Sequence, residues 1–423
     1  MRLLYTLLWI AAMPLVLLRL FWRSLKAPAY RLRWAERFGR FPPPNRTGGI
    51  WIHAVSVGEA QAVQPLIRRL LQREPSGSLV VTTTTPTGSA RVRELFGEQV
   101  FHVYFPFDLP WAVRGFLDRI QPSLAVLVET EVWPNLLGEC NRRRIPVLLA
   151  NGRLSERSAR GYRRLGSLSR ETFARFSAVA AQSEADAQRF VSVGVPPGRL
   201  TVTGSIKFDQ SIRGSVKEQA EVVRREWGVD RPVWVAASTH EGEEDWALDA
   251  HERVMRALPD ALLVLVPRHP ERFDRVAQLV QRRRLAMWRR TQRTPPPSGT
   301  AVFLGDTMGE LPVFLAAADA AFVGGSLLPV GGHNVLEPAA LGVPVAFGPH
   351  MFNFAQISQM LLDAGAAEQV DGAAALGETM QRWLGNASLR TRVGENGRRV
   401  VEVNRGALER VLRLVDDLLR EAG

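Results

Sequence analysis

Short apolar runs alternate with helical patterns along most of this chain, and this alternation limits the fold more than any other feature. In the first half we expect strands at Ile50–Val55, Leu79–Thr84, Val100–Phe105, Leu124–Val128, Pro146–Ala150, Ala178–Ala181 and Leu200–Thr203. After a polar stretch the pattern restarts, with expected strands at Val233–Ala236, Ala261–Pro267, Leu285–Met287, Val302–Leu304, Ala320–Val323 and Val343–Phe347. Such alternation is typical of parallel, doubly wound α/β sheets. We therefore predict two α/β halves that face each other across a cleft.

The length of the chain also predicts more than one domain. A chain of 423 residues is too long for one ordinary domain. We predict an N-terminal membrane anchor over residues 1–28, a first domain over 29–209 and a second domain over 210–400. Residues 401–423 carry a final helical pattern that can pack back on the first domain.

The amino terminus differs from the rest because it is almost uncharged. The sixteen residues Leu3–Leu18 carry no charge, and a helix over Leu3–Trp22 would span about 30 Å, which matches a bilayer core. Only Arg2 precedes the segment, whereas many basic residues follow it, which would hold the downstream side in the cytoplasm. Pro14 and Arg19 weaken a straight spanning helix, so a tilted or monotopic anchor and a buried first helix remain alternatives. We predict a membrane anchor with the main body in the cytoplasm.

The chain is strongly basic, with a net charge of +12. This charge favours nucleic acid, an anionic membrane surface or a phosphorylated substrate as a partner. The basic residues are dispersed and gather best beside the apolar amino terminus, and no nucleic-acid-binding motif is present. We therefore expect no nucleic acid among the partners. Cys140 is the only cysteine, which excludes an intramolecular disulfide and fits a reducing compartment.

The segment Gly49–Glu59 (GIWIHAVSVGE) carries the first sign of chemistry. A short buried strand is followed by a sharp turn and a helix, so Glu59 is expected at the carboxyl end of the strand. Ligands bind at that end in open α/β sheets, and a carboxylate there can take a proton from an incoming hydroxyl. The alternative is that Glu59 only stabilises the first helical turn through the helix dipole.

Further loops of the first half carry polar side chains at expected strand ends. Glu129 and Glu131 follow the strand that ends at Val128, and we expect them near Glu59; Asn151–Ser155 follows the next strand in the same manner. Lys207 is one of only three lysines and lies at the expected crossing between the domains. Its ammonium could neutralise a carboxylate or a phosphate. The alternatives are helix-capping carboxylates and a surface lysine.

Three loops of the second half also follow expected strands, so they should converge on one edge of a sheet. Gly324–Pro338 (GGSLLPVGGHNVLEP) is rich in glycine, and Asn334 suits the N-cap of the helix that follows. Such a helix start can hold a phosphate, and Glu337 could accept hydrogen bonds from ribose hydroxyls. Val266–Pro270 and Asp306–Leu311 are the other two loops. Plain connecting or solvated loops are the alternative for all three.

Metal sites and nucleophilic triads lack a pattern in this chain. The sequence has no HExxH motif, no cluster of Cys and His, no Asp-x-Asp at a strand end and no GxSxG motif. We therefore expect no metal and no other cofactor.

Taken together, these segments resemble the bacterial Kdo transferases, which attach 3-deoxy-D-manno-octulosonic acid (Kdo) to lipid A precursors. The motifs that carry the resemblance are HAVSVGE, TTTTPTG, YFPFD, VETEVWPN, NGRLS, GSIKFD, VPRHPER, DTMGEL and GGSLLPVGGHNVLEPAALGVPV. They run from the anchor to past Pro349. The resemblance implies a GT-B glycosyltransferase architecture of two Rossmann-like domains, with CMP-Kdo as donor and the lipid A precursor (lipid IVA) as acceptor. It also implies anchoring to the cytoplasmic face of the inner membrane.

The resemblance further implies roles for single residues. Glu59 is similar to the family's catalytic base, which deprotonates the acceptor hydroxyl for in-line attack on the anomeric carbon, with inversion of configuration. Glu129 and Lys207 resemble residues that assist the transition state. The donor-binding residues that the resemblance implies are Pro267, Arg268, Met308, Gly309, Glu310, Asn334, Val335, Leu336 and Glu337. Because the leaving group is a monophosphate, the resemblance implies no metal.

Three rival functions fit parts of the pattern. A nucleotide-sugar epimerase could share the two-domain fold but would gain little from a membrane anchor. A UDP-sugar transferase that makes another lipid-linked glycan would differ in its choice of donor nucleotide. A non-catalytic membrane-bound sensor would keep its activity when Glu59 is replaced by Gln.

Overall fold

The structure is a computed structural model that describes residues 1–73, 77–209 and 214–422. The chain divides into two compact units: unit 1 comprises Met1–Gln210 and Arg405–Gly423, and unit 2 comprises Ser211–Asn404. The expected change of domain at residue 210 falls at residues 210–213, which lie outside the described residues.

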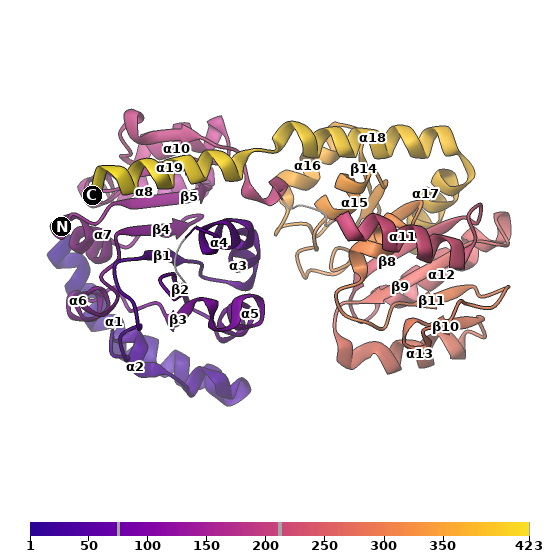
Figure 1. Cartoon of the computed structure of the whole chain (residues 1–423), viewed down its shortest axis with the longest axis horizontal. Helices are drawn as coiled ribbons and strands as arrows, with labels where there is room; N and C mark the ends of the chain where they lie inside the picture. Colours follow the sequence, from indigo (N-terminus) through magenta and orange to yellow (C-terminus); the bar gives the residue numbers. More distant parts are fainter. Residues whose placement is uncertain (74–76, 210–213, 423) are drawn as a thin grey trace. The chain divides into compact units, whose positions relative to one another are not determined.

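The described residues of unit 1 form a parallel seven-stranded sheet in the order β3-β2-β1-β4-β5-β6-β7 (Figure 1). The strands are β1 (Ile50–His53), β2 (Val80–Thr83), β3 (Phe101–Tyr104), β4 (Leu124–Val128), β5 (Val147–Gly152), β6 (Ala178–Ala181) and β7 (Leu200–Val202). The seven strands expected from the sequence are confirmed, with ends that differ by no more than two residues. The strand order reverses between β1 and β4, and such a switch point is where doubly wound sheets bind ligands.

Helices cover both faces of this sheet. They are α2 (Trp34–Arg37), α3 (Val57–Ala62), α4 (Gln64–Leu71), α5 (Pro86–Phe96), α6 (Pro110–Ile120), α7 (Pro134–Arg142), α8 (Glu156–Arg164), α9 (Ser167–Phe173), α10 (Glu184–Val193) and α19 (Ala407–Ala422). Ile50 and Ile52 belong to one buried cluster and Trp51 to another, because successive strand residues point to opposite faces. Both faces of the sheet are therefore hydrophobic core.

The helix α19 completes unit 1 although it is far away in the sequence. Val411, Leu412 and Val415 are buried in the same cluster as Ile52, and Figure 1 shows α19 in yellow along the indigo and magenta elements of this unit. The carboxylate of Asp209 accepts hydrogen bonds from the backbone amides that open α19, at 2.6 and 2.7 Å. The last helix is thus a structural part of the first unit.

The first helix, α1 (Arg2–Lys26), exposes a long apolar surface. Among the described residues it alone is long and apolar enough to cross a membrane, with a mean hydropathy of 2.0 over Arg2–Leu25. Large side chains along it are solvent-exposed, for example Leu3, Leu15 and Trp22 at 74, 70 and 69%. Exposed apolar side chains of this number need an apolar environment, which is what a membrane anchor would provide.

The described residues of unit 2 form a second parallel seven-stranded sheet, in the order β10-β11-β9-β8-β12-β13-β14. The strands are β8 (Val233–Thr239), β9 (Leu262–Pro267), β10 (Met287–Arg289), β11 (Val302–Leu304), β12 (Ala320–Val323), β13 (Val345–Phe347) and β14 (Ala367–Gln369). The helices are α11 (Gly214–Trp227), α12 (Glu243–Ala257), α13 (Phe273–Arg282), α14 (Leu311–Ala316), α15 (Leu336–Leu341), α16 (Ala355–Asp363), α17 (Ala373–Gly385) and α18 (Ala387–Asn404). The six expected strands are confirmed, and β14 was not expected. Here the strand order reverses between β8 and β12.

Candidate active site

Glu59 lies in the first turn of α3, directly after β1. Ser56 is the N-cap of this helix, and its hydroxyl oxygen accepts a hydrogen bond from the Glu59 amide at 3.3 Å. The Glu59 carboxylate accepts bonds from the Val55 amide at 2.7 Å and from the Ser56 hydroxyl at 3.2 Å. These reciprocal bonds stabilise the helix start. They also hold the carboxylate at the carboxyl end of β1, so the helix-start interpretation and a catalytic one are compatible.

The pKa of Glu59 is raised well above that of an ordinary glutamate. Burial, and then the negative charge of Glu129, raises the pKa of Glu59 from 4.5 to about 8, against the opposing hydrogen bond from the Val55 amide. A carboxyl group with a pKa near the working pH can both accept and release a proton. Perturbed carboxyl groups of this kind are typical of functional sites.

Glu129 and Lys207 form an ion pair between the segments that follow β4 and β7. Glu129 directly follows β4 and has a left-handed backbone conformation, with φ at 62°. Lys207 lies on the 3₁₀ helix η4 (Ile206–Asp209), and its Nζ is 3.4 Å from Oε1 of Glu129. Since β4 is adjacent to β1 at the switch point, this places an ammonium and a carboxylate near Glu59. The other carboxylate of this loop, Glu131, accepts a bond from the Trp133 indole at 2.7 Å.

Asn151, at the carboxyl end of β5, positions the segment that carries Lys207, and its neighbour Ala150 positions Glu129. The preceding carbonyl, of Ala150, accepts the Glu129 amide at 3.0 Å. The Oδ1 of Asn151 accepts the amide of Ile206, the neighbour of Lys207, at 3.1 Å. Asn151 is fully buried and left-handed, with φ at 54°, a conformation that Asn tolerates better than most residues. The separation of the pair is therefore set by the end of β5.

The glycine-rich loop of unit 2 is organised by a buried carboxylate. Glu243, the first residue of α12, is fully buried. Its two carboxylate oxygens accept four backbone amides at 2.7–3.0 Å, those of His240, Gly325, Ser326 and Leu327. Glu243 therefore shapes the start of the Gly324–Pro338 loop from the end of β8. The sequence interpretation did not assign this residue.

A second buried carboxylate ties the loop after β9 to the end of β8. Arg272 donates to the two oxygens of Glu244 at 2.6 and 3.0 Å, and the Thr239 hydroxyl donates to the same carboxylate at 2.9 Å. The amide of Arg268 donates to the Thr239 carbonyl at 3.0 Å. This places the partly exposed Arg268 at the carboxyl edge of the sheet, between β8 and β11.

Two histidines pack together between the loops after β8 and β12. Nε2 of His240 lies 2.8 Å from Nε2 of His333, and the rings are nearly parallel, at an angle of 5°. Burial, and then the charge of Arg268, lowers the pKa of His333 to about 3, and burial lowers the pKa of His240 as well. Both rings are therefore neutral at neutral pH, and one donates a hydrogen bond to the other.

The structure corrects one detail of the loop after β12. Asn334 was expected at the N-cap of the following helix, but α15 begins at Leu336 and has Val335 at its N-cap. The reason is that Asn334 forms a turn of its own, in which its Oδ1 accepts the Leu336 amide at 3.1 Å. Its Nδ2 donates to Oε1 of Glu337 at 3.0 Å, and burial raises the pKa of Glu337.

The loop after β11 holds the remaining expected donor residues. Met308 is 60% exposed, and Gly309 has a left-handed φ of 85°. Glu310 is engaged within the protein: Arg290 donates to it at 2.8 Å, and Thr307 also donates to it. Burial raises the pKa of Glu310, but these hydrogen bonds outweigh burial and hold it below its ordinary value. Pro267 is the buried last residue of β9. The nine expected donor residues thus follow β9, β11 and β12.

Comparisons with known proteins agree with this arrangement. Residues 32–210 match a family described as 3-deoxy-D-manno-octulosonic-acid transferase (kdotransferase). The chain is 42% identical over 424 residues to the 3-deoxy-D-manno-octulosonic acid transferase of Haemophilus influenzae, covering 99% of each protein. It is 37% identical to the enzyme of the same name from Bordetella pertussis, covering 98% of this chain and 99% of that protein. Among solved structures it is similar to UDP-GlcNAc 2-epimerase from Neisseria meningitidis, with a TM-score of 0.57, 13% identity and coverage of 87% and 100%. At that identity the structural likeness concerns the fold alone.

Proposed function

The chain belongs to the family of 3-deoxy-D-manno-octulosonic acid (Kdo) transferases and is a glycosyltransferase, and from this premise we propose that Glu59 is its general base. Kdo is transferred from CMP-Kdo to the lipid A precursor, and Glu129 with Lys207 supports the transition state. The observation that carries the proposal is a carboxyl group with a pKa of about 8 next to an ion pair at the β1/β4 switch point of unit 1.

In the proposed mechanism, the Glu59 carboxylate takes the proton of the attacking sugar hydroxyl of the acceptor. The hydroxyl oxygen forms a bond to the anomeric carbon of Kdo while the bond from that carbon to the CMP oxygen breaks. CMP leaves with the bonding electron pair, and because the hydroxyl attacks from the face opposite CMP, the anomeric configuration inverts. Lys207 supplies positive charge to the anionic donor, and Glu129 holds the ammonium in position at 3.4 Å.

We assign the donor nucleotide to the loops of unit 2. Arg268 and the backbone amides of the glycine-rich loop suit the CMP phosphate. Glu337, held by Asn334, suits the ribose hydroxyls, and the exposed backbone around Gly309 suits a base edge. A monophosphate leaving group carries less charge than a diphosphate, so the proposal includes no metal.

We assign the protein to the cytoplasmic face of the inner membrane, with α1 as its anchor. The exposed leucines of α1 and its mean hydropathy of 2.0 support the anchor. Basic residues such as Arg19, Arg23 and Arg31 follow the apolar segment and suit an anionic membrane surface, while the bond from Thr6 to Asn135 holds the start of α1 on unit 1, so we assign α1 to the membrane surface rather than across the bilayer.

The pH dependence of transfer tests the assignment of the base. Since the pKa of Glu59 is about 8, most of the base is protonated at pH 7. We expect kcat/KM to rise about tenfold per pH unit below this pKa and to level off above it. In Glu129→Gln, the loss of a negative charge lowers the pKa of Glu59, so this rise moves to lower pH. The measurement is product formation by mass spectrometry, with CMP-Kdo generated in situ. A flat profile, or the same profile in both proteins, would contradict the proposal.

Substitution of Asn151 tests how the ion pair is positioned. Asn151→Gly keeps the left-handed backbone but loses the side-chain oxygen that holds Ile206. We expect kcat to fall roughly 10- to 100-fold, as for a misplacement of about 1 Å, with little change in the KM for CMP-Kdo. Steady-state kinetics measure both constants.

The matched variant is Asn151→Asp, which keeps an acceptor oxygen for the Ile206 amide and should recover most of kcat. Equal loss of kcat in both variants would argue against the positioning role. A melting temperature equal to that of the parent protein would exclude general unfolding as the cause.

A further inference from the structure

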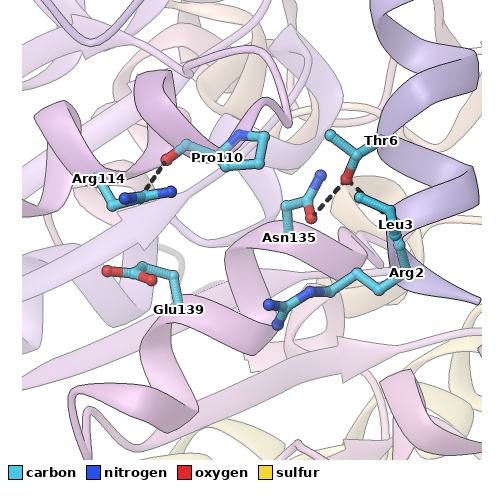
Figure 2. A pocket seen from close by; sticks show the side chains of 7 residues that line it. All are labelled: Arg2, Leu3, Thr6, Pro110, Arg114, Asn135 and Glu139. Atoms are coloured by element: carbon cyan, nitrogen blue, oxygen red, sulfur yellow. Dashed lines mark hydrogen bonds between the residues drawn. The ribbon is translucent and has the colours of Figure 1, made fainter.

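A cavity of about 250 Å³ lies where the start of α1 meets α6 and α7 in unit 1. Its lining residues are Arg2, Leu3, Thr6, Pro110, Arg114, Asn135 and Glu139. Figure 2 shows Arg114 and Glu139 on one side and Thr6 and Arg2, from α1, on the other. None of these residues belongs to the proposed catalytic or donor-binding set.

The membrane helix itself forms one wall of the cavity and is fastened there. The hydroxyl of Thr6 lies 3.1 Å from Oδ1 of Asn135, to which it donates a hydrogen bond (Figure 2). The guanidinium of Arg2 lies directly on Gly138 of α7, since a Cβ at that position would be 2.0 Å from its Nη1. Gly138 thus permits the close approach of Arg2, and the cavity exists only with α1 in this place.

The cavity is lined by two arginines, Arg2 and Arg114. Among the residues that the structure describes, no carboxylate forms an ion pair with Arg2 or Arg114. Glu139, the only acidic residue of the lining, is paired with Arg142 and Arg143 at 2.6 and 2.8 Å. Hydrogen bonds from Arg142 first, and from Arg143, lower the pKa of Glu139 to about 2.

Asp108 interacts electrostatically with Arg2 but does not line the cavity. Asp108 is buried, and its two oxygens accept the amides of Asn135 and Leu136 at 2.9 and 2.8 Å. The helix α6 begins without a side-chain cap, and Nε of Arg114 donates to the carbonyl of Pro110 at 3.2 Å. The positive end of the α6 dipole therefore adds to the charge of Arg114.

The surroundings of the cavity indicate what kind of anion would bind. Leu3, which lines it, is 74% exposed, and Leu7 one turn further along α1 is 54% exposed. An anionic group would thus bind beside an apolar helix surface, as the headgroup of a lipid does. We propose that this cavity binds a phosphate group of a lipid, with Arg2 and Arg114 as its ligands. The inference rests on the proposed function, in which the enzyme works on a phosphorylated lipid at a membrane.

The position of the cavity also fits a role in the reaction. Asn135 belongs to the segment that follows β4, four residues after Glu131 and six after Glu129. A lipid phosphate held by Arg2 and Arg114, beside Asn135, would therefore bind next to the same chain segment that carries part of the proposed catalytic site. The phosphate could belong to the acceptor or to a phospholipid of the bilayer.

Two measurements on the full chain distinguish these sources. The first, in detergent, compares the KM for the phosphorylated acceptor with that for its dephosphorylated form. If the acceptor's phosphate binds, Arg114→Gln and Arg2→Gln should each raise the KM for the phosphorylated form about tenfold, the effect of losing one charge-assisted contact. The KM for the dephosphorylated form and kcat should be unchanged.

The second measurement is co-sedimentation with vesicles of phosphatidylcholine, with or without phosphatidylglycerol. If a bilayer phospholipid binds, phosphatidylglycerol should increase the co-sedimented fraction of the parent protein but not that of the variants. Co-sedimentation with vesicles of phosphatidylcholine alone should be unchanged.

The control is Arg413→Gln, which removes an exposed arginine from α19 in the same unit. A raised KM for the phosphorylated acceptor, or a loss of co-sedimentation with phosphatidylglycerol vesicles, supports the site if the control does not show it. Which of the two changes is seen identifies the source of the phosphate. No change in both measurements, or the same loss in the control, overturns it. Since the first result is a comparison of KM values from an active enzyme and the second is a binding measurement, neither depends on whether Glu59 is the base. A protein with no transfer activity would instead count against the proposed function.

Discussion

Glu59→Gln is expected to lower kcat for Kdo transfer roughly 100- to 10,000-fold while leaving CMP binding almost unchanged. General bases contribute roughly 10²- to 10⁴-fold to rates, and a neutral amide cannot take the proton of the acceptor hydroxyl. The substitution keeps the size of the side chain, and its oxygen can still accept the Val55 amide, which is now bonded at 2.7 Å. The start of α3 should therefore be preserved.

The measurement combines single-turnover transfer with calorimetric titration of CMP. Glu156→Gln is a matched control, because Glu156 also lies in the first turn of a helix after a serine N-cap. This control should transfer Kdo at the parental rate. If a folded Glu59→Gln protein loses CMP binding, or if it keeps most of its transfer rate, Glu59 is not the base.

Glu243→Ala should strongly weaken CMP binding, because the glycine-rich loop Gly324–Pro338 would lose the carboxylate that shapes its start. The carboxylate satisfies four buried backbone amides, and each buried amide left without a partner costs about 1–3 kcal/mol. The sum is several kcal/mol, which is a large part of the stability of an ordinary domain. We therefore expect both a weaker affinity for CMP, by more than about 100-fold, and a lower melting temperature.

A second variant keeps this test informative if Glu243→Ala does not fold. Glu243→Gln retains one acceptor oxygen but turns an N–H₂ group towards backbone N–H groups, so it should still weaken CMP binding. The control is Glu241→Gln, since the Glu241 side chain is 68% exposed and pairs with the exposed Arg275 on the surface. A folded Glu243→Gln protein with parental CMP affinity would show that the loop does not need this carboxylate.

The sequence was sufficient for almost the whole fold because buried parallel strands leave a strong local signal. Runs such as Leu124–Val128 and Leu262–Pro267 are continuously apolar, as strands buried on both faces must be. The strand β14 was missed because it is a three-residue edge strand with the sequence Ala-Glu-Gln, which is exposed at its end and has low β-propensity. Short edge strands form through pairing with a neighbour, here β13, and pairing is not visible in a local pattern.

Some residues of the candidate site could likewise be predicted from the sequence, and others could not. Glu59, Glu129 and Lys207 could be singled out because each follows a recognisable strand or stands out by its residue type. The supporting residues Glu243 and Asn151 could not, because their partners lie 82–84 and 55 residues away along the chain. In the sequence, Glu243 is one of several acidic residues at a helix start, and only the fold shows that it is buried. What the sequence could not supply is therefore the long-range hydrogen bonding that positions the site.

The return of the chain into unit 1 has a consequence for how the protein is made. The helix α19 supplies Val411, Leu412 and Val415 to the core around Ile52, yet it is translated after all of unit 2. At roughly 5–20 residues per second, about 10–40 s pass between synthesis of residue 210 and of Ala407. During that time a ribosome-bound chain presents the apolar surface of β1 and α4 without its last helix, while unit 2, which ends at Asn404, is still being synthesised. We expect the amino-terminal unit to reach its native state only after the whole chain has been made, and to be a natural client for chaperones during synthesis.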